Sequence, residues 1–156
     1  MSSPDDKSLS LGDSIRVPYP APTSAAVTAV MKGNRSRDTR PEVRLRSELH
    51  RRGLRFRKDY VIQLDGRRIR ADIVFTRQRL AVFVDGCFWH GCPQHGRRPR
   101  SNAEYWAAKL ARNAERDRMA NDALVAAGWR VLRLWEHENP EEAASSVMAA
   151  LRDLVR

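Results

Sequence analysis

The chain has 156 residues, 42% of them hydrophobic and 31% charged, with 29 basic against 19 acidic side chains and a net charge of +10. This size and balance predict one globular domain and exclude a multidomain assembly, a wholly disordered chain and, because no apolar run reaches about eighteen residues, a membrane-spanning protein. Arginine supplies 25 of the basic residues, and its planar fork favours a nucleic-acid partner over a membrane surface, although a GC-rich genome would also raise the share of arginine.

Residues 1–26 are rich in Ser, Pro, Asp and Gly and show no hydrophobic periodicity. They predict a disordered or loosely docked tail, with the folded domain over residues 27–156. The tail lacks the basic and apolar regions of a secretory signal. We therefore expect a cytoplasmic protein.

The first helix signal is Thr39-Arg40-Pro41-Glu42, which has the spacing of a capping box and a proline suited to the first turn, and Gly53 would end this helix. Two runs with strand character follow, at residues 60–64 and 67–75. The dipeptide Asp65-Gly66 between them is typical of a tight turn. The sequence thus predicts a helix followed by a β-hairpin.

A continuous apolar run at residues 80–84 predicts a central strand that is buried on both faces. A second capping box, at residues 101–104, opens a long helix that Gly128 would end. Residues 131–135 predict another strand, and Asn139 caps a last helix. This order of elements predicts an α/β fold with a mixed central sheet flanked by helices.

Asp72 lies among apolar residues of the second strand of the predicted hairpin, where a charge is costly unless something compensates it. Mg²⁺ would do so, because this hard cation prefers carboxylate oxygens and leaves positions for water and phosphate oxygens. A salt bridge to one of the neighbouring arginines is the alternative. The residues alone leave both interpretations open.

The loop at residues 87–100 holds both cysteines of the chain and two of its four histidines. Cys87-x4-Cys92-x2-His95 offers three zinc ligands, and His137, after the last predicted strand, can complete a tetrahedron. We therefore predict a structural Zn²⁺ site that holds the loop in place. Two free thiols with unconnected histidines are the alternative.

The segment Val84-Asp85-Gly86-Cys87-Phe88-Trp89-His90-Gly91-Cys92-Pro93 resembles the very short patch repair (Vsr) endonucleases, a family of DNA mismatch nickases. The resemblance extends from about Val30 to Glu138 and includes Gly128-Trp129-Arg130-Val131-Leu132 at the matching distance. It implies a three-layer, restriction-endonuclease-like fold whose phosphodiester hydrolysis uses Mg²⁺.

The resemblance also implies catalytic roles by position. Asp72 matches the metal-binding aspartate, and the backbone carbonyl of Val84 falls at a second metal contact. His90 matches the general base, a task that suits the pKa of an imidazole, and Glu42 matches an acid that acts through water on the metal. A family member carries threonine and histidine where this chain has Val84 and Asp85, so Asp85 is either an added ligand or a structural anion.

Two of these roles have structural alternatives. His90 lies between two cysteines and would suit a zinc site instead. Glu42 is also the acid of the capping box, and the two roles are compatible. The resemblance implies the zinc site as well, with a cysteine in the family at the position of His137 and a different spacing within the loop.

For DNA contacts, the resemblance implies that Phe88, Trp89 and Trp106 insert between base steps, where unstacking costs least at a mismatch. Met31 would enter from the opposite groove. For Trp106, packing in the core is the alternative.

Phosphate contacts are predicted for the basic segment at residues 32–40, with a merely solvated surface as the alternative. Its candidate residues are Lys32, Arg35 and Arg37. Asn113 and Asp117, four residues apart on the long predicted helix, match a polar cluster of the family that would orient His90 or a water molecule. A surface ion pair is the alternative there.

Together these features predict a monomeric, Mg²⁺-dependent, zinc-stabilised DNA endonuclease that nicks one strand beside a T:G mismatch and starts the repair of deaminated 5-methylcytosine. The resemblance permits mismatch-repair proteins as further partners. Two alternatives stay open: a related restriction or defence nuclease without mismatch preference, and a zinc-stabilised DNA-binding module without activity.

Overall fold

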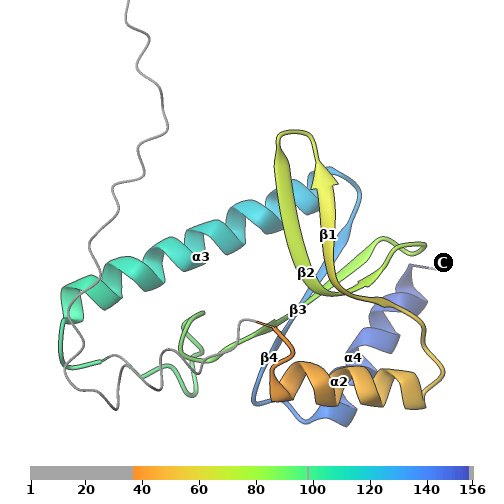
Figure 1. Ribbon diagram of the computed structural model, residues 1–156, viewed down its shortest axis with the longest axis horizontal. Helices are drawn as coiled ribbons and strands as arrows, with labels where there is room; N and C mark the ends of the chain where they lie inside the picture. The colour runs from red at the N-terminus through yellow and green to blue at the C-terminus, as the bar shows by residue number, and fades with distance from the viewer. Residues whose placement is uncertain (1–36, 98, 155–156) are drawn as a thin grey trace, which may run out of the picture.

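The computed structural model describes residues 37–97 and 99–154. Within these residues four strands form one sheet, in the order β1-β2-β3-β4, and three helices flank it. The elements in chain order are α2 (Arg40–Arg51), β1 (Arg57–Leu64), β2 (Arg67–Phe75), β3 (Leu80–Asp85), α3 (Ala103–Ala126), β4 (Arg130–Trp135) and α4 (Pro140–Asp153) (Figure 1).

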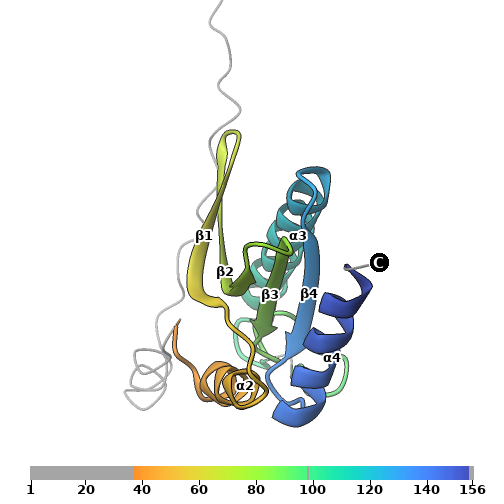
Figure 2. The ribbon, with the colours of Figure 1, turned by 90° about the vertical axis from the view of Figure 1, so that its right-hand side faces the viewer.

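The sheet is mixed because its connections differ in length. β1, β2 and β3 are antiparallel neighbours, and the tight turn after β1 places Leu64 opposite Arg67. β4 lies parallel to β3, since the long helix α3 carries the chain back between the two strands. The β1–β2 hairpin continues beyond its pairing with β3 and extends away from the body of the molecule (Figures 1 and 2).

Hydrophobic side chains form two clusters, one on each face of the sheet. On one face, Leu49 of α2 and Val147 of α4 pack in a cluster with Ile73. On the other face, Leu124 of α3 packs in a cluster with Val74. The neighbours Ile73 and Val74 therefore point to opposite sides, as the pleat of a strand requires. The predicted three-layer α/β fold with a mixed central sheet is confirmed.

The predicted helix caps at Thr39 and Asn139 are both at the expected residues, but only one works as a capping side chain. Asn139 accepts the backbone N–H of Glu141 at 2.8 Å and caps α4. Thr39 makes no side-chain cap to α2, and its hydroxyl donates instead to Glu42 Oε1 at 2.9 Å. The capping box predicted at Thr39 is therefore wrong.

Two element boundaries also differ from expectation. α3 begins at Ala103, after Asn102 in a left-handed conformation (φ 55°) without a side-chain cap, so the capping box predicted from Ser101 is wrong. A capping residue needs an extended backbone, which Asn102 does not have. β1 begins at Arg57, earlier than its apolar run, because Arg57 and its successor pair with β2.

Several predictions concern residues outside the described ranges. They are the tail at residues 1–26 and the DNA contacts Met31, Lys32 and Arg35, and they stay predictions, as does the domain boundary at residue 27. None of the helices in residues 37–97 and 99–154 combines the length and the apolar character that a membrane crossing requires.

Candidate active site

A cavity of about 750 Å³ opens where β2 and β3 diverge, and residues of α2, α3 and β4 complete its lining. All five residues predicted for catalysis line this cavity: Glu42, Asp72, Val84, Asp85 and His90. They come from a helix, two strands and a loop, so the fold collects them from three separate stretches of the chain.

Asp72 lies just beyond the last paired residues of β2 and β3. Its Oδ2 accepts the backbone N–H of Val84 at 2.7 Å. This side-chain bond takes the place of a backbone bond between β2 and β3, whose pairing ends at Ile73 and Val82. Burial is the main cause that raises the pKa of Asp72 to about 6, and the hydrogen bond from Val84 opposes it. Three nearby carboxylates raise the pKa as well: Glu42, Asp85 and Asp59. In the described part of the chain no arginine pairs with Asp72, so the alternative of a salt bridge finds no partner there.

Glu42 lies buried in the first turn of α2, with 6% of its surface exposed. Its Oε1 accepts the hydroxyl of Thr39, and its Oε2 lies 3.9 Å from Nη1 of Arg46. Both Glu42 and Thr39 line the cavity. The proline-containing start of α2 thus places a carboxylate beside Asp72, where its charge adds to the local negative potential.

His90 is held from α3. Its Nδ1 lies 2.5 Å from Oδ2 of Asp117 and 3.8 Å from Oδ1 of Asp85. An Nδ1–H that donates to Asp117 leaves Nε2 as the proton acceptor of the ring. The Cys/His cluster described below has four donors without His90, so the alternative of His90 as a ligand of that site does not fit.

Asp85 is a buried anion, paired with Arg133 on the neighbouring strand. Nη1 of Arg133 donates to both oxygens of Asp85, at 2.8 and 3.0 Å. Asp85 is 7% exposed. Of the two roles left open by the sequence, this geometry favours the structural anion over the added ligand.

Asn113 and Asp117 lie one turn apart on α3, and both contact the loop that carries His90. Asp117 meets the imidazole, whereas the buried Asn113 donates to the backbone carbonyl of Trp89 at 3.1 Å. Arg116 donates in turn to the side-chain oxygen of Asn113. One face of α3 therefore holds both the side chain of His90 and the backbone next to it.

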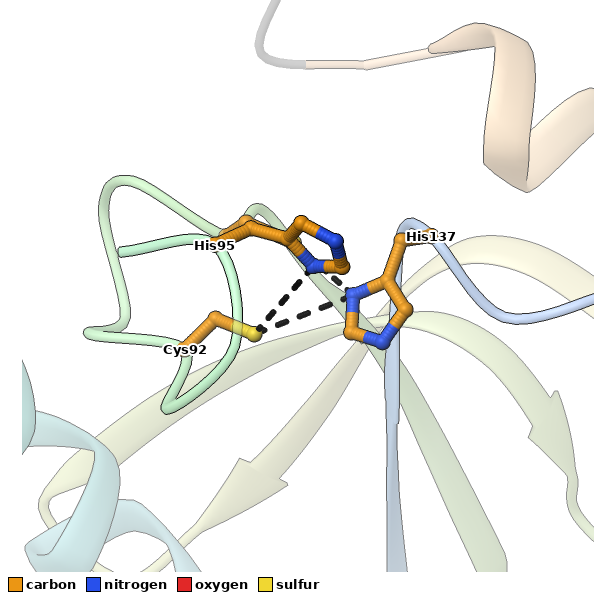
Figure 3. Close-up of side chains that lie close together, drawn as sticks. Cys92, His95 and His137 are labelled. Carbon is orange, nitrogen blue, oxygen red and sulfur yellow. Dashed lines mark hydrogen bonds between the residues drawn. The ribbon is translucent and has the colours of Figure 1, made fainter. Parts of the chain in front are cut away.

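The four predicted zinc ligands converge beside the cavity, and their donor atoms all lie within 4.8 Å of one another. Nδ1 of His137 is 3.0 Å from Cys87 Sγ and 3.7 Å from Cys92 Sγ, which is itself 3.9 Å from Nδ1 of His95. Figure 3 shows Cys92 and His95 of the loop after β3 facing His137, which follows β4. Tetrahedral zinc with bonds of about 2.0 to 2.3 Å needs donor separations of about 3.3 to 3.8 Å. The separations here, from 3.0 Å to at most 4.8 Å, bracket this range, so small side-chain rotations would bring all four donors onto one ion.

Aromatic rings gather at the N-terminal end of α3. The ring centroids of Phe88, Trp89 and Trp106 lie 5.0 to 6.0 Å apart, and Tyr105 lies 5.2 Å from Trp106. Nζ of Lys109 is 5.5 Å from the ring of Trp89. All four rings are only partly buried and belong to neither hydrophobic cluster of residues 37–97 and 99–154, so packing in those two clusters does not account for Trp106.

Among the predicted phosphate contacts, the described residue is Arg37, which is exposed and lies 3.3 Å from Asp59. Five charged residues of the cavity are not among the predicted site residues: Arg68, Arg70, Arg116, Arg133 and Glu136. A signal for Arg133 was its place inside an apolar strand, the same signal that marked Asp72. Arg68 and Arg70 precede Asp72 at intervals of two, which on a strand is the same side.

Comparison with known proteins identifies the family. A family model described as DNA mismatch endonuclease Vsr matches residues 22–95. The chain is 52% identical over 137 residues to the type II nicking enzyme V.NaeI of Lentzea aerocolonigenes, a match that covers 87% of this chain and 82% of the relative. The chain belongs to the Vsr family.

Two further relatives extend the similarity of this Vsr-family protein. Its identity to the type II nicking enzyme V.XorIIP of Xanthomonas oryzae pv. oryzae is 43% over 133 residues, 81% of this chain and 89% of the relative. Its identity to the DNA mismatch endonuclease Vsr of Escherichia coli is 39% over 110 residues, 68% of this chain and 66% of the relative. The protein is a DNA endonuclease, as predicted, and a DNA-binding module without activity does not agree with this family.

Proposed function

We propose that this Vsr-family endonuclease nicks one strand of duplex DNA beside a T:G mismatch, by hydrolysis that depends on Mg²⁺, and so starts the repair of deaminated 5-methylcytosine. The observation that carries the proposal is the cavity that holds Glu42, Asp72 and His90 beside a partly exposed aromatic cluster. The names of relatives, mismatch endonuclease in one case and nicking enzyme in others, support it.

The acidic side of the cavity fits a hard divalent cation. Burial is the main cause that raises the pKa of Asp72 to about 6, three neighbouring carboxylates add to it, and a bound cation would offset both costs of ionising this group. Oxygen donors are the ligands that Mg²⁺ prefers. Asp72 and the carbonyl of Val84 would hold the ion, with Glu42 close by. Mg²⁺ bound there would stabilise negative charge on the oxygens of the scissile phosphate.

The proton chemistry falls to His90. Nε2 would accept the proton of the attacking water, while Asp117 keeps the Nδ1–H in place and stabilises the imidazolium that forms. Glu42 would accept a hydrogen bond from the same water and orient it. Arg68 and Arg70 line the cavity and would neutralise phosphates next to the cleaved one.

We propose that the four-donor cluster binds structural Zn²⁺. Its donors come from the loop after β3 and from the residues after β4. Four protein donors complete a tetrahedral shell and leave no position for substrate, which is the arrangement of a structural site. The ion would tie the His90 loop to the end of β4. His137 supplies an imidazole where the family resemblance has a thiolate, and Zn²⁺ accepts either.

Recognition of the mismatch is assigned to the aromatic cluster, above all to Phe88, Trp89 and Trp106. An inserted ring must unstack a base step, at a cost of a few kcal/mol that is smallest where pairing is already poor. The contact of Lys109 with the rings adds a positive charge next to the insertion site. The entry of Met31 from the opposite groove stays a prediction.

A nicking assay on duplexes of one sequence, with each mismatch in turn and with perfect pairing, tests the proposal. We expect one-strand cleavage beside T:G in Mg²⁺ and none in EDTA. Equal cleavage of the paired duplex would support a restriction or defence nuclease of the same family instead, and cleavage in EDTA would contradict the Mg²⁺ dependence. The monomeric state and a contact with mismatch-repair proteins stay predictions.

A further inference from the structure

Arg133 of β4 lies at the centre of a charged network that lines the cavity. Nη1 donates to both oxygens of Asp85 at 2.8 and 3.0 Å, and Nη2 lies 3.4 Å from Oδ1 of Asp117. Nε donates to Asn121 at 3.0 Å, and the guanidinium carbon stands 4.5 Å from the ring centroid of Phe83. Contacts to β3 and α3 therefore fix this side chain in one position.

The first consequence concerns which carboxylate can bind a cation. Both oxygens of Asp85 are occupied by Arg133, and only 10% of its side chain is exposed. Asp72 uses one oxygen for the N–H of Val84, and its other oxygen makes no hydrogen bond within residues 37–97 and 99–154. Both carboxylates line one cavity. Without Arg133, a cation in this cavity could therefore bind either Asp72 or Asp85.

The second consequence concerns the imidazole. Asp117 presents Oδ2 to Nδ1 of His90 and Oδ1 to Arg133. A carboxylate held at both oxygens has little freedom to rotate, and outer partners of this kind orient the ring that they support. Arg133 on β4 therefore helps to fix the orientation of the Asp117 carboxylate that contacts His90.

We propose that Arg133 is a positioning residue for cleavage: it withholds Asp85 from the catalytic cation, which then binds at Asp72, and it orients Asp117 against His90. The inference rests on the proposed Mg²⁺-dependent hydrolysis. Arg133 acts only through the two carboxylates, because its donors are already engaged by them and by Asn121.

The test compares Arg133→Gln with the double variant Asp85→Asn/Arg133→Gln in the full chain loaded with zinc. Arg130→Gln is the matched control, because Arg130 lies on the same strand but its side chain, within the described residues, bonds only to Ala150 and Asp153 of α4. We expect Arg133→Gln to lower kcat about 10- to 100-fold, with KM for mismatched DNA changed less than about threefold. The double variant should recover about tenfold of the loss, because no unpaired buried anion remains.

Mn²⁺ binding, followed by electron paramagnetic resonance, provides a readout besides activity. Arg133→Gln should gain a weak extra Mn²⁺ site at the freed Asp85 carboxylate, and the double variant should lose it again. Arg133→Lys keeps the charge without the fork, so it should bind Mn²⁺ like the wild type while kcat falls only partly.

The outcomes separate the two proposals. A wild type that nicks with Mg²⁺, together with Arg133→Gln at wild-type kcat and Mn²⁺ stoichiometry, overturns the role of Arg133 alone. A double variant no more active than Arg133→Gln, at equal melting temperature, overturns it too, because that is the result of lost packing. A wild type that binds no Mn²⁺ and nicks without a divalent cation overturns the proposed function itself, and this inference with it.

Discussion

Two groups of potential metal ligands share the loop after β3, and their chemistry is opposite. The cavity group offers carboxylate oxygens around a space of about 750 Å³. The Cys/His group offers two thiols and two imidazoles with donor atoms within 4.8 Å, and its two cysteines are 7% and 3% exposed. Hard oxygen donors with open space suit a cation that must also meet phosphate and water, whereas a closed set of S and N donors suits structural zinc.

The two groups also differ in how the protein treats their charge. The Asp72 carboxyl, with a pKa raised to about 6, is mostly ionised at neutral pH and lacks a pairing arginine among the described residues. Burial, and the neighbouring Cys92, raise the pKa of the Cys87 thiol to about 11, so this thiol must release a proton when zinc binds. The Asp72 carboxylate is thus negatively charged before a cation binds, whereas the Cys87 thiol becomes a thiolate only when zinc binds. Four predictions test whether the two regions are as independent as this contrast implies.

The largest expected effect is the loss of nicking when the cavity alone is altered. Asp72→Asn should abolish detectable nicking, and His90→Ala should lower its rate about 10²- to 10⁴-fold, the range of general-base catalysis. Rates on a T:G duplex measure this, with a gel-shift assay to show that DNA binding survives. Zinc content should stay as in the wild type, and loss of zinc from either variant would contradict the independence of the regions.

The Cys/His cluster should control folding stability. Cys92→Ser should lower the zinc content and reduce the melting temperature by about 10 °C or more, since structural zinc contributes several kcal/mol to folding. Metal analysis and thermal unfolding measure the two effects. Asp72→Asn is the matched control with full zinc content. Cys92→Ser that keeps its zinc and its melting temperature would show that the cluster is not a zinc site.

Asp72→Asn should have the opposite effect on stability. Because folding raises the pKa of Asp72 from 3.8 to about 6, the folded state disfavours the carboxylate, and the wild type loses stability as the pH rises through this interval. In EDTA-free buffer without Mg²⁺, the variant should be more stable at pH 8 by up to about 3 kcal/mol, with a smaller gain at pH 5. Denaturant unfolding at both pH values measures this.

Mg²⁺ gives this third prediction its control. The ion should stabilise the wild type at pH 8 and leave Asp72→Asn unchanged, because only the wild type presents the carboxylate. A variant that is less stable than the wild type at pH 8 without Mg²⁺ would mean that Asp72 stabilises the fold through its bond to Val84 more than its charge disturbs it.

The smallest effect is expected at Glu136, which joins the two regions. Its Oε1 accepts the backbone N–H of Cys87 at 2.7 Å, and its side chain also lines the cavity. Glu136→Ala should weaken zinc binding about tenfold by loosening this ligand, in the way of other outer partners. Glu136→Gln keeps an oxygen acceptor and should bind zinc like the wild type. Competition with a zinc-binding dye measures both affinities, and equal values for the two variants would remove Glu136 from this role.

Local patterns in the sequence predicted most of the elements, because each carries its own signal. The apolar run of β3, the turn at Asp65-Gly66 and the cap at Asn139 all lie where the pattern placed them. The side-chain caps predicted at Thr39 and Ser101 are wrong, although α2 does start directly after Thr39. There a side chain can turn toward the active site, as in the bond from Thr39 to Glu42, or a left-handed residue can intervene, and no short pattern records either event.

By itself, the sequence determined the kinds of ligand, the two metal chemistries it predicts and the family, since these depend on residue type and spacing. Only the tertiary structure decided which charges meet. Arg133 neutralises Asp85 across a separation of 48 residues, and Asp117 reaches His90 across 27. The parallel pairing of β3 with β4 and the packing of α3 on the sheet create these contacts, and both depend on the burial of apolar side chains such as Leu124, which no pattern around the charged residues records.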